Sequence, residues 1–200
     1  MTSSPQYPLT EFASEVEAVG EAFRRLLQAV RLERDAFVWM DFNDRATADA
    51  LILVLFTSLF QLAADLGQVA TEANTLLRLA TSASGINLIF EVVVQGFFFW
   101  LGFAGVLLFV VRMLYKAPAK YPLLLRVVGF AYPTLLVGIF VPSLGLPDVV
   151  SFVVGSLWFI AVVAHGVRYE SDLGTARSYG SVAIALVLLT VARAILSGLF

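Results

Sequence analysis

Five long apolar stretches constrain this chain more than any other feature of its sequence. Each holds about 20 residues or more, which is the length that a helix needs to cross the hydrocarbon core of a bilayer. We therefore expect an all-α polytopic membrane protein with a bundle of five transmembrane helices. The predicted spans are residues 48–67, 86–114, 123–142, 148–167 and 178–200. The second is longer than a bilayer requires and should tilt or run past the lipid.

The composition excludes several classes of function. Hydrophobic residues make up 60% of the chain and charged residues 14%, against about 45–50% and about 25% in soluble domains. Cysteine is absent, which excludes disulfides and thiolate chemistry. The single histidine, His165, cannot form a zinc site without three carboxylate partners. The net charge of −2 offers no basic surface for nucleic acid. We expect no metal, no cofactor and no catalytic residue.

Residues 1–47 are predicted to form a cytoplasmic segment ahead of a transmembrane domain that covers residues 48–200. Apolar residues recur in residues 10–34 at steps of four and three, which predicts an amphipathic helix. It carries too many charges to span, so it could lie on the membrane surface, dock on the membrane domain or dimerise. The first 20 residues are acidic and lack the apolar core of a cleaved signal peptide. The predicted buried face of the helix holds Phe12, Val16, Val19, Phe23, Leu26 and Val30.

The basic residues orient the predicted spans. If the N-terminus lies inside, the inner segments hold eleven of the thirteen lysines and arginines. The exceptions are Arg78, in an outer loop, and Arg193, within a span. Because cytoplasmic loops carry the excess of positive charge, we expect the N-terminus in the cytoplasm and the C-terminus outside.

The third span carries residues that weaken a helix. Gly129 and Pro133 are followed by Gly138 and Pro142, and Arg126 lies at the inner end of the span. We expect the Arg126 side chain to reach the headgroup region. Glycine and proline persist in a span where neighbouring helices approach closely and satisfy the freed carbonyls. The pattern indicates a kinked, tightly packed central helix or, alternatively, a hinge or the lining of a site.

Polar residues inside spans are the candidate functional residues. Glu91 and Arg193 are the deepest charges, and at about 1.5 Å per residue both fall in the outer third of the membrane. Gln95 shares the face of Glu91, together with small residues that mark helix contacts. We expect a cluster, in which the charges could form a structural ion pair, line a polar cavity for an ion, headgroup or proton, or never meet. His165 is expected at the inner interface. The predicted cluster is Gln61, Asp65, Glu91, Gln95, Thr190 and Arg193.

The layout resembles that of the Yip (Ypt-interacting protein) domain family in its prokaryotic branch. The likeness covers roughly residues 30–200 and rests on the five-span order, on YPLLLRVVGFAYPTLLVGIFVP and on LWFIAVVAHGVRYESDLGTARSYGSVAIALVL. Gly129-Phe130-x-x-Pro133 is similar to the glycine–tyrosine motif of that family's third span. Eukaryotic members carry Asp-Leu-x-Gly-Pro before the first span, and the corresponding MDFNDRATADAL lacks Gly-Pro. For eukaryotic members the resemblance implies membrane traffic or membrane shaping, and the binding of Rab GTPases is not carried over because the motif is missing. For the prokaryotic branch it implies little about function, and the location expected from it is the cytoplasmic membrane of a prokaryote.

Three classes of function follow from these observations. The first is a non-enzymatic membrane protein that shapes the bilayer or serves as an accessory scaffold. Its expected partners are the lipid bilayer and a second copy of the chain or another membrane protein. The second is a small transporter or channel with a site around Glu91 and Arg193, although no inverted repeat is visible. The third is a membrane enzyme, for which no catalytic motif is present.

Overall fold

The computed structural model describes residues 9–69, 83–137 and 147–197. Every described element is helical, which confirms the all-α prediction. The order is α1 (Leu9–Val30), α2 (Arg34–Phe42), α3 (Ala46–Val69), α5 (Ala83–Phe109), the π-helix η1 (Val110–Leu114), α6 (Tyr121–Ala131), the 3-10 helix η2 (Tyr132–Leu136), α8 (Asp148–Ser171) and α9 (Thr175–Ser197).

Three of the described helices are long and apolar enough to cross a membrane. They cover Ala46–Ala64, Asn87–Leu114 and Thr175–Ile195, which match the first, second and fifth predicted spans. The helix over Tyr121–Leu136 is apolar but shorter, and the fourth predicted span falls within the 24-residue α8. Large apolar side chains such as Phe56, Phe98 and Val187 are exposed on these helices. Such surfaces fit insertion into a membrane, where lipid would cover them.

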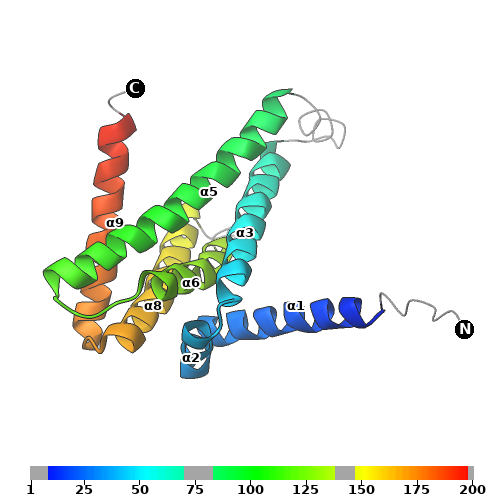
Figure 1. Ribbon diagram of the computed structural model, residues 1–200. Coiled ribbons are helices and arrows are strands. Elements are labelled where there is room, and N and C mark those ends of the chain that lie inside the picture. Colours follow the sequence, from blue (N-terminus) through cyan, green and yellow to red (C-terminus); the bar gives the residue numbers. More distant parts are fainter. Residues whose placement is uncertain (1–8, 70–82, 138–146, 198–200) are drawn as a thin grey trace, which may run out of the picture.

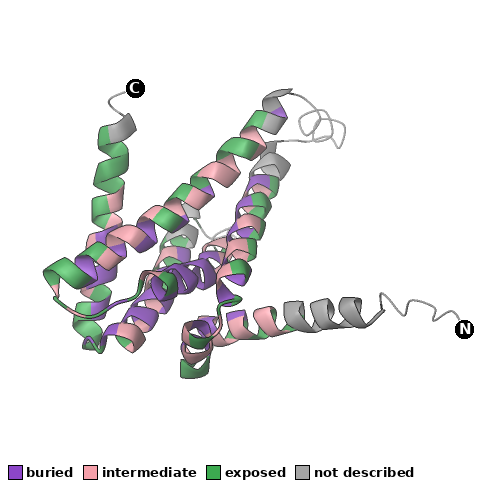
Figure 2. Cartoon of the chain, viewed as in Figure 1, coloured by how far each residue is buried: buried purple, intermediate pink, exposed green. Residues whose placement is uncertain are grey.

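Helix α6 lies at the centre of the bundle. It packs against α3, α5 and α8, and also against α1 and α2. All residues from Leu123 to Ala131 are buried (Figure 2). Because α6 is enclosed on so many sides, its side chains are set by protein neighbours instead of lipid. This confirms the tightly packed central helix that the glycines and prolines of the third span predict.

Two glycines permit the close approach of helices to α6. A methyl group at Gly129 would lie 2.5 Å from the β-carbon of Ala50 in α3. A methyl group at Gly166 in α8 would lie 2.4 Å from a side-chain carbon of Val127 in α6. Both distances are shorter than any stable carbon–carbon contact, so only glycine fits at these crossings.

The helix changes character at Pro133, where α6 gives way to the tighter η2. Proline cannot donate to the carbonyl of Gly129, and the N–H of Tyr132 bonds to that carbonyl instead. The Thr134 hydroxyl bonds to the carbonyl of Ala131 over 2.7 Å. The freed carbonyls are thus satisfied locally. Gly138 and Pro142, the other members of the predicted motif, lie outside the described residues.

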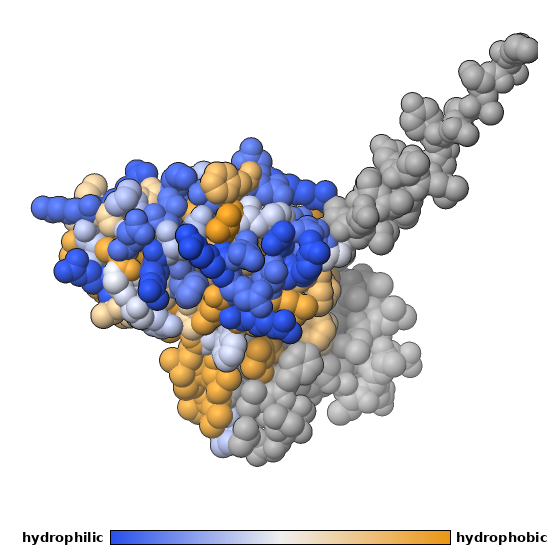
Figure 3. Space-filling view, turned by 90° about the horizontal axis from the view of Figure 1, so that it is seen from below, coloured by the Kyte–Doolittle hydropathy of each residue, from blue (hydrophilic) through white to orange (hydrophobic). Residues whose placement is uncertain are grey.

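The N-terminal helices lie across one end of the bundle. Helix α1 runs across the direction of α3 and α9 and extends beyond the bundle on one side (Figure 1). The loop over residues 115–120 and the turn between α8 and α9 lie at the same end (Figure 1). Viewed from this side, hydrophilic residues cover much of the visible face, with hydrophobic residues along one margin (Figure 3). This end therefore combines the segments that the sequence predicts to be cytoplasmic.

Candidate functional site

The short helix α2 connects the N-terminal segment to the bundle and was not predicted from the sequence. It begins after Leu32, whose φ of 61° ends α1 and turns the chain. Ala36, Phe37 and Met40 share one face of α2 and are fully buried. This spacing of one helical turn was a signal for a short docked helix. The two acidic and one basic residues among its nine obscured that signal.

Arg126 joins α2 to the central helix. One terminal nitrogen, Nη1, donates to the carbonyls of Met40 over 2.6 Å and Asp41 over 3.4 Å. Its Nε donates to the Thr47 hydroxyl over 2.8 Å, and Nη2 contacts the Asp44 carboxylate at 2.9 Å. The carbonyls belong to the last turn of α2, where no following turn supplies N–H donors for them. This turn also carries the negative end of the helix dipole. Arg126 therefore caps α2 from a different helix.

The predicted reach of Arg126 to the headgroups is wrong. The residue is only 6% exposed. Snorkelling relieves a charge that has no protein partner, whereas this guanidinium finds four acceptors in residues 40–47. The position of the arginine in its span could be predicted from the sequence, whereas the helix that folds beneath it could not.

A second set of contacts links α2 with α8 and the loop before α6. The Lys120 ammonium donates to the Asp41 carboxylate over 3.1 Å, and the Lys120 backbone N–H donates to Glu170 over 2.8 Å. The hydrogen bond and charge of Asp41 raise the pKa of Lys120. Burial raises the pKa of Glu170, and the Lys120 N–H partly opposes this shift. One lysine thus ties three segments together at the polar end.

Helix α1 is held by its C-terminal half. The guanidinium of Arg25 lies 5.6 Å from the ring centre of Trp39 in α2, a cation–π contact. The indole N–H of Trp158 in α8 donates to the carbonyl of Val30 over 3.1 Å. Leu26 and Ala29 are buried against the bundle. The orientation of α1 relative to the spans is therefore fixed by several contacts.

The apolar face of α1 continues beyond these contacts. Phe23 shares the face of Leu26, yet it is 60% exposed in the protein. Its neighbour one turn later, Leu27, is also exposed. Of the predicted buried face, Leu26 is thus covered by protein and Phe23 is not, because the bundle ends between them. The side chains of Phe12, Val16 and Val19 lie outside the described residues.

Among the described residues, the members of the predicted outer cluster form no hydrogen bond or ion pair from one helix to another. Gln95 donates to Glu91 over 3.1 Å, but both belong to α5 and both are exposed. Thr190 bonds to the carbonyl of Leu186 in its own helix. Gln61 is half-buried on α3, and Arg193 is exposed on α9. The Asp65 side chain is outside the described residues.

The ion pair expected between Glu91 and Arg193 is not formed within the chain. Among the described residues no ion pair joins them. Gly102 of α5 lies near Leu189 of α9, which places Arg193 about a turn beyond that contact, level with the middle of α5. Helices α5 and α9 then diverge toward the ends that carry these charges (Figure 1). The prediction compared the depths of the two residues, counted from the ends of their spans, and did not consider the angle at which α5 and α9 cross.

No protein-family model, curated protein or solved structure matches this chain. The resemblance to the Yip family therefore stays a prediction. The residues that the structure does bring together, from distant parts of the sequence, are those at the polar end beneath α6. Arg126, Lys120, Asp41 and Glu170 fix α2 to α6, α8 and the loop before α6, and so build a platform against which α1 packs. We take this platform as the candidate functional site.

Proposed function

We propose that this chain is a non-enzymatic integral membrane protein of the Yip-like type that organises or shapes the bilayer. In this proposal five helices span a prokaryotic cytoplasmic membrane, with the N-terminus inside and the C-terminus outside. Helix α1 lies in the inner interface, and the platform around Arg126 holds it at a fixed angle to the spans. A wedge inserted into one leaflet expands that leaflet alone, which favours curvature.

The observation that carries the proposal is the uncovered apolar face of α1. The helix is clamped at Leu26 and Ala29, and the same face extends past the bundle through Phe23. In the interface this face would enter the acyl region while the charged face stays in water. A helix on a flexible tether could leave the membrane without consequence for the spans. A clamped helix cannot, so its insertion is coupled to them.

The topology draws support from the polar end. The three segments expected inside are the N-terminal helices, residues 112–126 and residues 168–177. Lys120 contacts both Asp41 and Glu170, so one residue brings all three segments to the same side of the bundle. Five spans explain this arrangement, because two spans separate each inner segment from the next and the chain therefore returns to the same side.

Reconstitution into vesicles tests the shaping role. The purified chain would be placed at fixed protein-to-lipid ratio in vesicles of zwitterionic and anionic phospholipid, and their diameters measured by electron cryo-microscopy. We expect smaller or tubular vesicles. The double variant Val16→Gln, Phe23→Gln places two polar groups on the apolar face and should restore the protein-free diameters.

The matched control is Ser14→Gln, Glu17→Gln, which changes the opposite face of the same helix. This control should behave as the original chain. Equal diameters for the original chain and the apolar-face variant would reject membrane shaping by α1. Circular dichroism of each variant shows whether the helices remain formed.

A second copy of the chain is the proposed partner within the membrane. Glu91 and Arg193 are exposed on different helices, and within the described part of the chain neither has an ion-pair partner. Opposite charges in a poorly solvating medium favour contact between copies. The alternative of a transporter built around these two residues draws no support from a structure in which they stand apart.

Cysteine cross-linking tests this partner, because the chain has no cysteine of its own. Membranes that contain both a Glu91→Cys chain and an Arg193→Cys chain should yield a disulfide-linked dimer on oxidation. Replacing Arg193→Cys by Val187→Cys, on the same helix, provides the control and should give little dimer. Absence of the first product would reject the proposed contact between copies.

A further inference from the structure

A pocket of 320 Å³ lies between α2 and the C-terminal part of α8, at the polar end of the molecule. Phe37 forms an apolar part of its wall and packs against His165 with ring centres 5.3 Å apart. Its volume is at the lower end of the range for small-molecule sites, about 300–1,000 Å³. The lining residues are Arg34, Phe37, His165, Arg168, Tyr169 and Asp172.

The two arginines of this pocket come from different helices and are not engaged elsewhere. Within the described part of the chain, neither Arg34 nor Arg168 takes part in an ion pair. Other cations at the same end are committed. Arg112 gives both of its hydrogen bonds to the carbonyl of Ala119, and Lys120 binds Asp41. The second basic pocket is lined by these two committed cations and by Lys116, so among the described residues it offers one cation without an ion pair or side-chain hydrogen bond, where the first pocket offers two.

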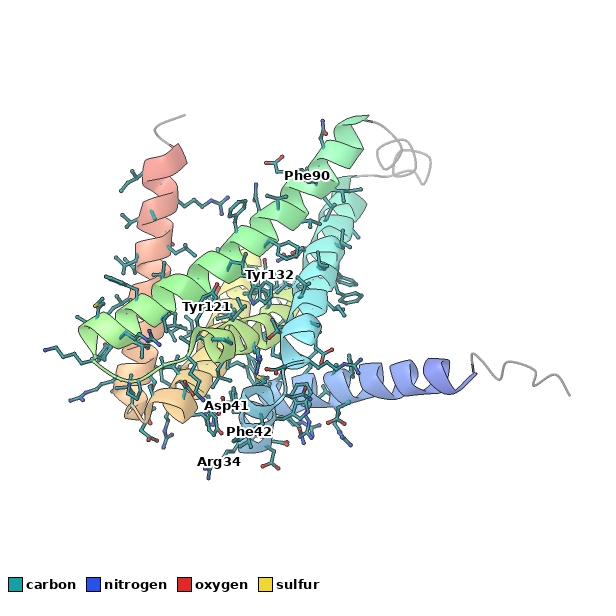
Figure 4. The ribbon with its side chains drawn as sticks, in the orientation of Figure 1. Arg34, Asp41, Phe42, Phe90, Tyr121 and Tyr132 are labelled. Atoms are coloured by element: carbon teal, nitrogen blue, oxygen red, sulfur yellow. The ribbon has the colours of Figure 1, made fainter. Side chains whose placement is uncertain are left out.

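The charges of the lining favour an anion. Asp172 is the one carboxylate among the six lining residues, against two guanidinium groups. Arg34 is also the first residue of α2 (Figure 4), so the positive end of that helix dipole lies at the pocket. Guanidinium groups bind phosphate oxygens through paired hydrogen bonds. The chemistry of the site is thus that of a receptor for a phosphate group.

We propose that this pocket binds the phosphate of an anionic phospholipid headgroup from the inner leaflet. The phosphate would lie between Arg34 and Arg168, and the glycerol portion would contact Tyr169. This inference rests on the proposed topology, which places α2 and the end of α8 at the inner interface. A bound headgroup would join α2 to α8 and so reinforce the platform that holds α1.

Calorimetric titration of the full chain in a non-ionic detergent tests the site. The probes are dioctanoyl phosphatidylglycerol, dioctanoyl phosphatidylcholine and inorganic phosphate. We expect saturable binding of the phosphatidylglycerol only. The double variant Arg34→Gln, Arg168→Gln should bind it at least about tenfold more weakly, because hydrogen bonds between charged groups are strong and the variant loses them. The variant Arg34→Lys, Arg168→Lys keeps the charge, loses the paired bonds and should bind with intermediate strength.

The control variant is Arg31→Gln, Arg177→Gln, which removes the same charge from exposed arginines outside the pocket. It should bind as the original chain does. Equal weakening in the control would show attraction by net charge alone and would overturn the site. Equal binding of inorganic phosphate would overturn the lipid as the ligand. Because the titration uses no vesicles, its failure is distinguishable from a failure of the shaping role.

Discussion

Replacing Arg126 by methionine should release α2 from the bundle and leave the spans folded. Methionine retains much of the apolar volume but none of the donors. The variant loses the bonds to the Met40 carbonyl at 2.6 Å and the Thr47 hydroxyl at 2.8 Å. Arg126, which makes both bonds, is only 6% exposed. Water therefore does not readily reach these acceptors to replace the guanidinium.

The magnitude follows from these contacts. Hydrogen bonds that involve a charged group contribute about 1.5–3 kcal/mol each. The Asp44 side chain is fully exposed, so its ion pair with Arg126 adds about 0–1 kcal/mol. Once α2 detaches, water forms hydrogen bonds with its carbonyls and so recovers part of the free energy lost with the bonds from Arg126. We therefore expect Arg126→Met to lower the free energy of unfolding by about 3 kcal/mol, and Asp44→Asn by less than about 1 kcal/mol.

Two measurements check this expectation. Unfolding in mixed micelles of ionic and non-ionic detergent gives the free energies, and hydrogen exchange reports the protection of residues 34–42. In Arg126→Met the amides of α2 should lose protection while those of α6 keep theirs. Arg112→Met is the control, because that arginine also donates to a carbonyl but does not contact α2. If α2 keeps its protection, or if Asp44→Asn costs as much as Arg126→Met, the capping role of Arg126 is refuted.

Three further predictions concern packing, pH and topology. Gly129→Leu should lower the free energy of unfolding in mixed micelles by about 1–3 kcal/mol through overpacking. Gly105→Ala should not, because an added methyl group there would meet no packing neighbour within 4 Å. Because burial raises the pKa of Glu170 in the folded state, its contribution to stability is greatest in acid and declines as the pH rises through that pKa. Glu170→Gln should remove this part of the pH dependence, and an unchanged profile would contradict the assignment. Alkaline phosphatase should be active when fused after Phe200 and inactive when fused after Lys116, and the reverse pattern would contradict the topology.

The positions of the helices could be predicted because hydrophobicity over about 20 residues is a strong local signal. The packing at Gly129 and the satisfied carbonyls near Pro133 also followed from residue chemistry. These features depend on a residue and its neighbours in one helix. The sequence therefore indicated the central, enclosed position of the third apolar stretch.

The platform could not be predicted, because its contacts join residues far apart in the sequence. Arg126 had an adequate local explanation in snorkelling, and nothing near it in the sequence indicates the carbonyls of Met40 and Asp41. The prediction for Glu91 and Arg193 failed for a related reason. It used depth alone, whereas the angle between α5 and α9 decides whether two side chains at similar depth can meet.

The central claim is that a clamped α1 inserts its apolar face into the inner leaflet. Spin labels at Phe23→Cys and Gln28→Cys, each the only cysteine in its chain, test it in vesicles by their accessibility to oxygen and to a water-soluble nickel complex. We expect oxygen in the lipid to reach the label at position 23 and the nickel complex not to reach it. The nickel complex should reach the label at position 28. Equal access of the nickel complex to both positions would contradict it.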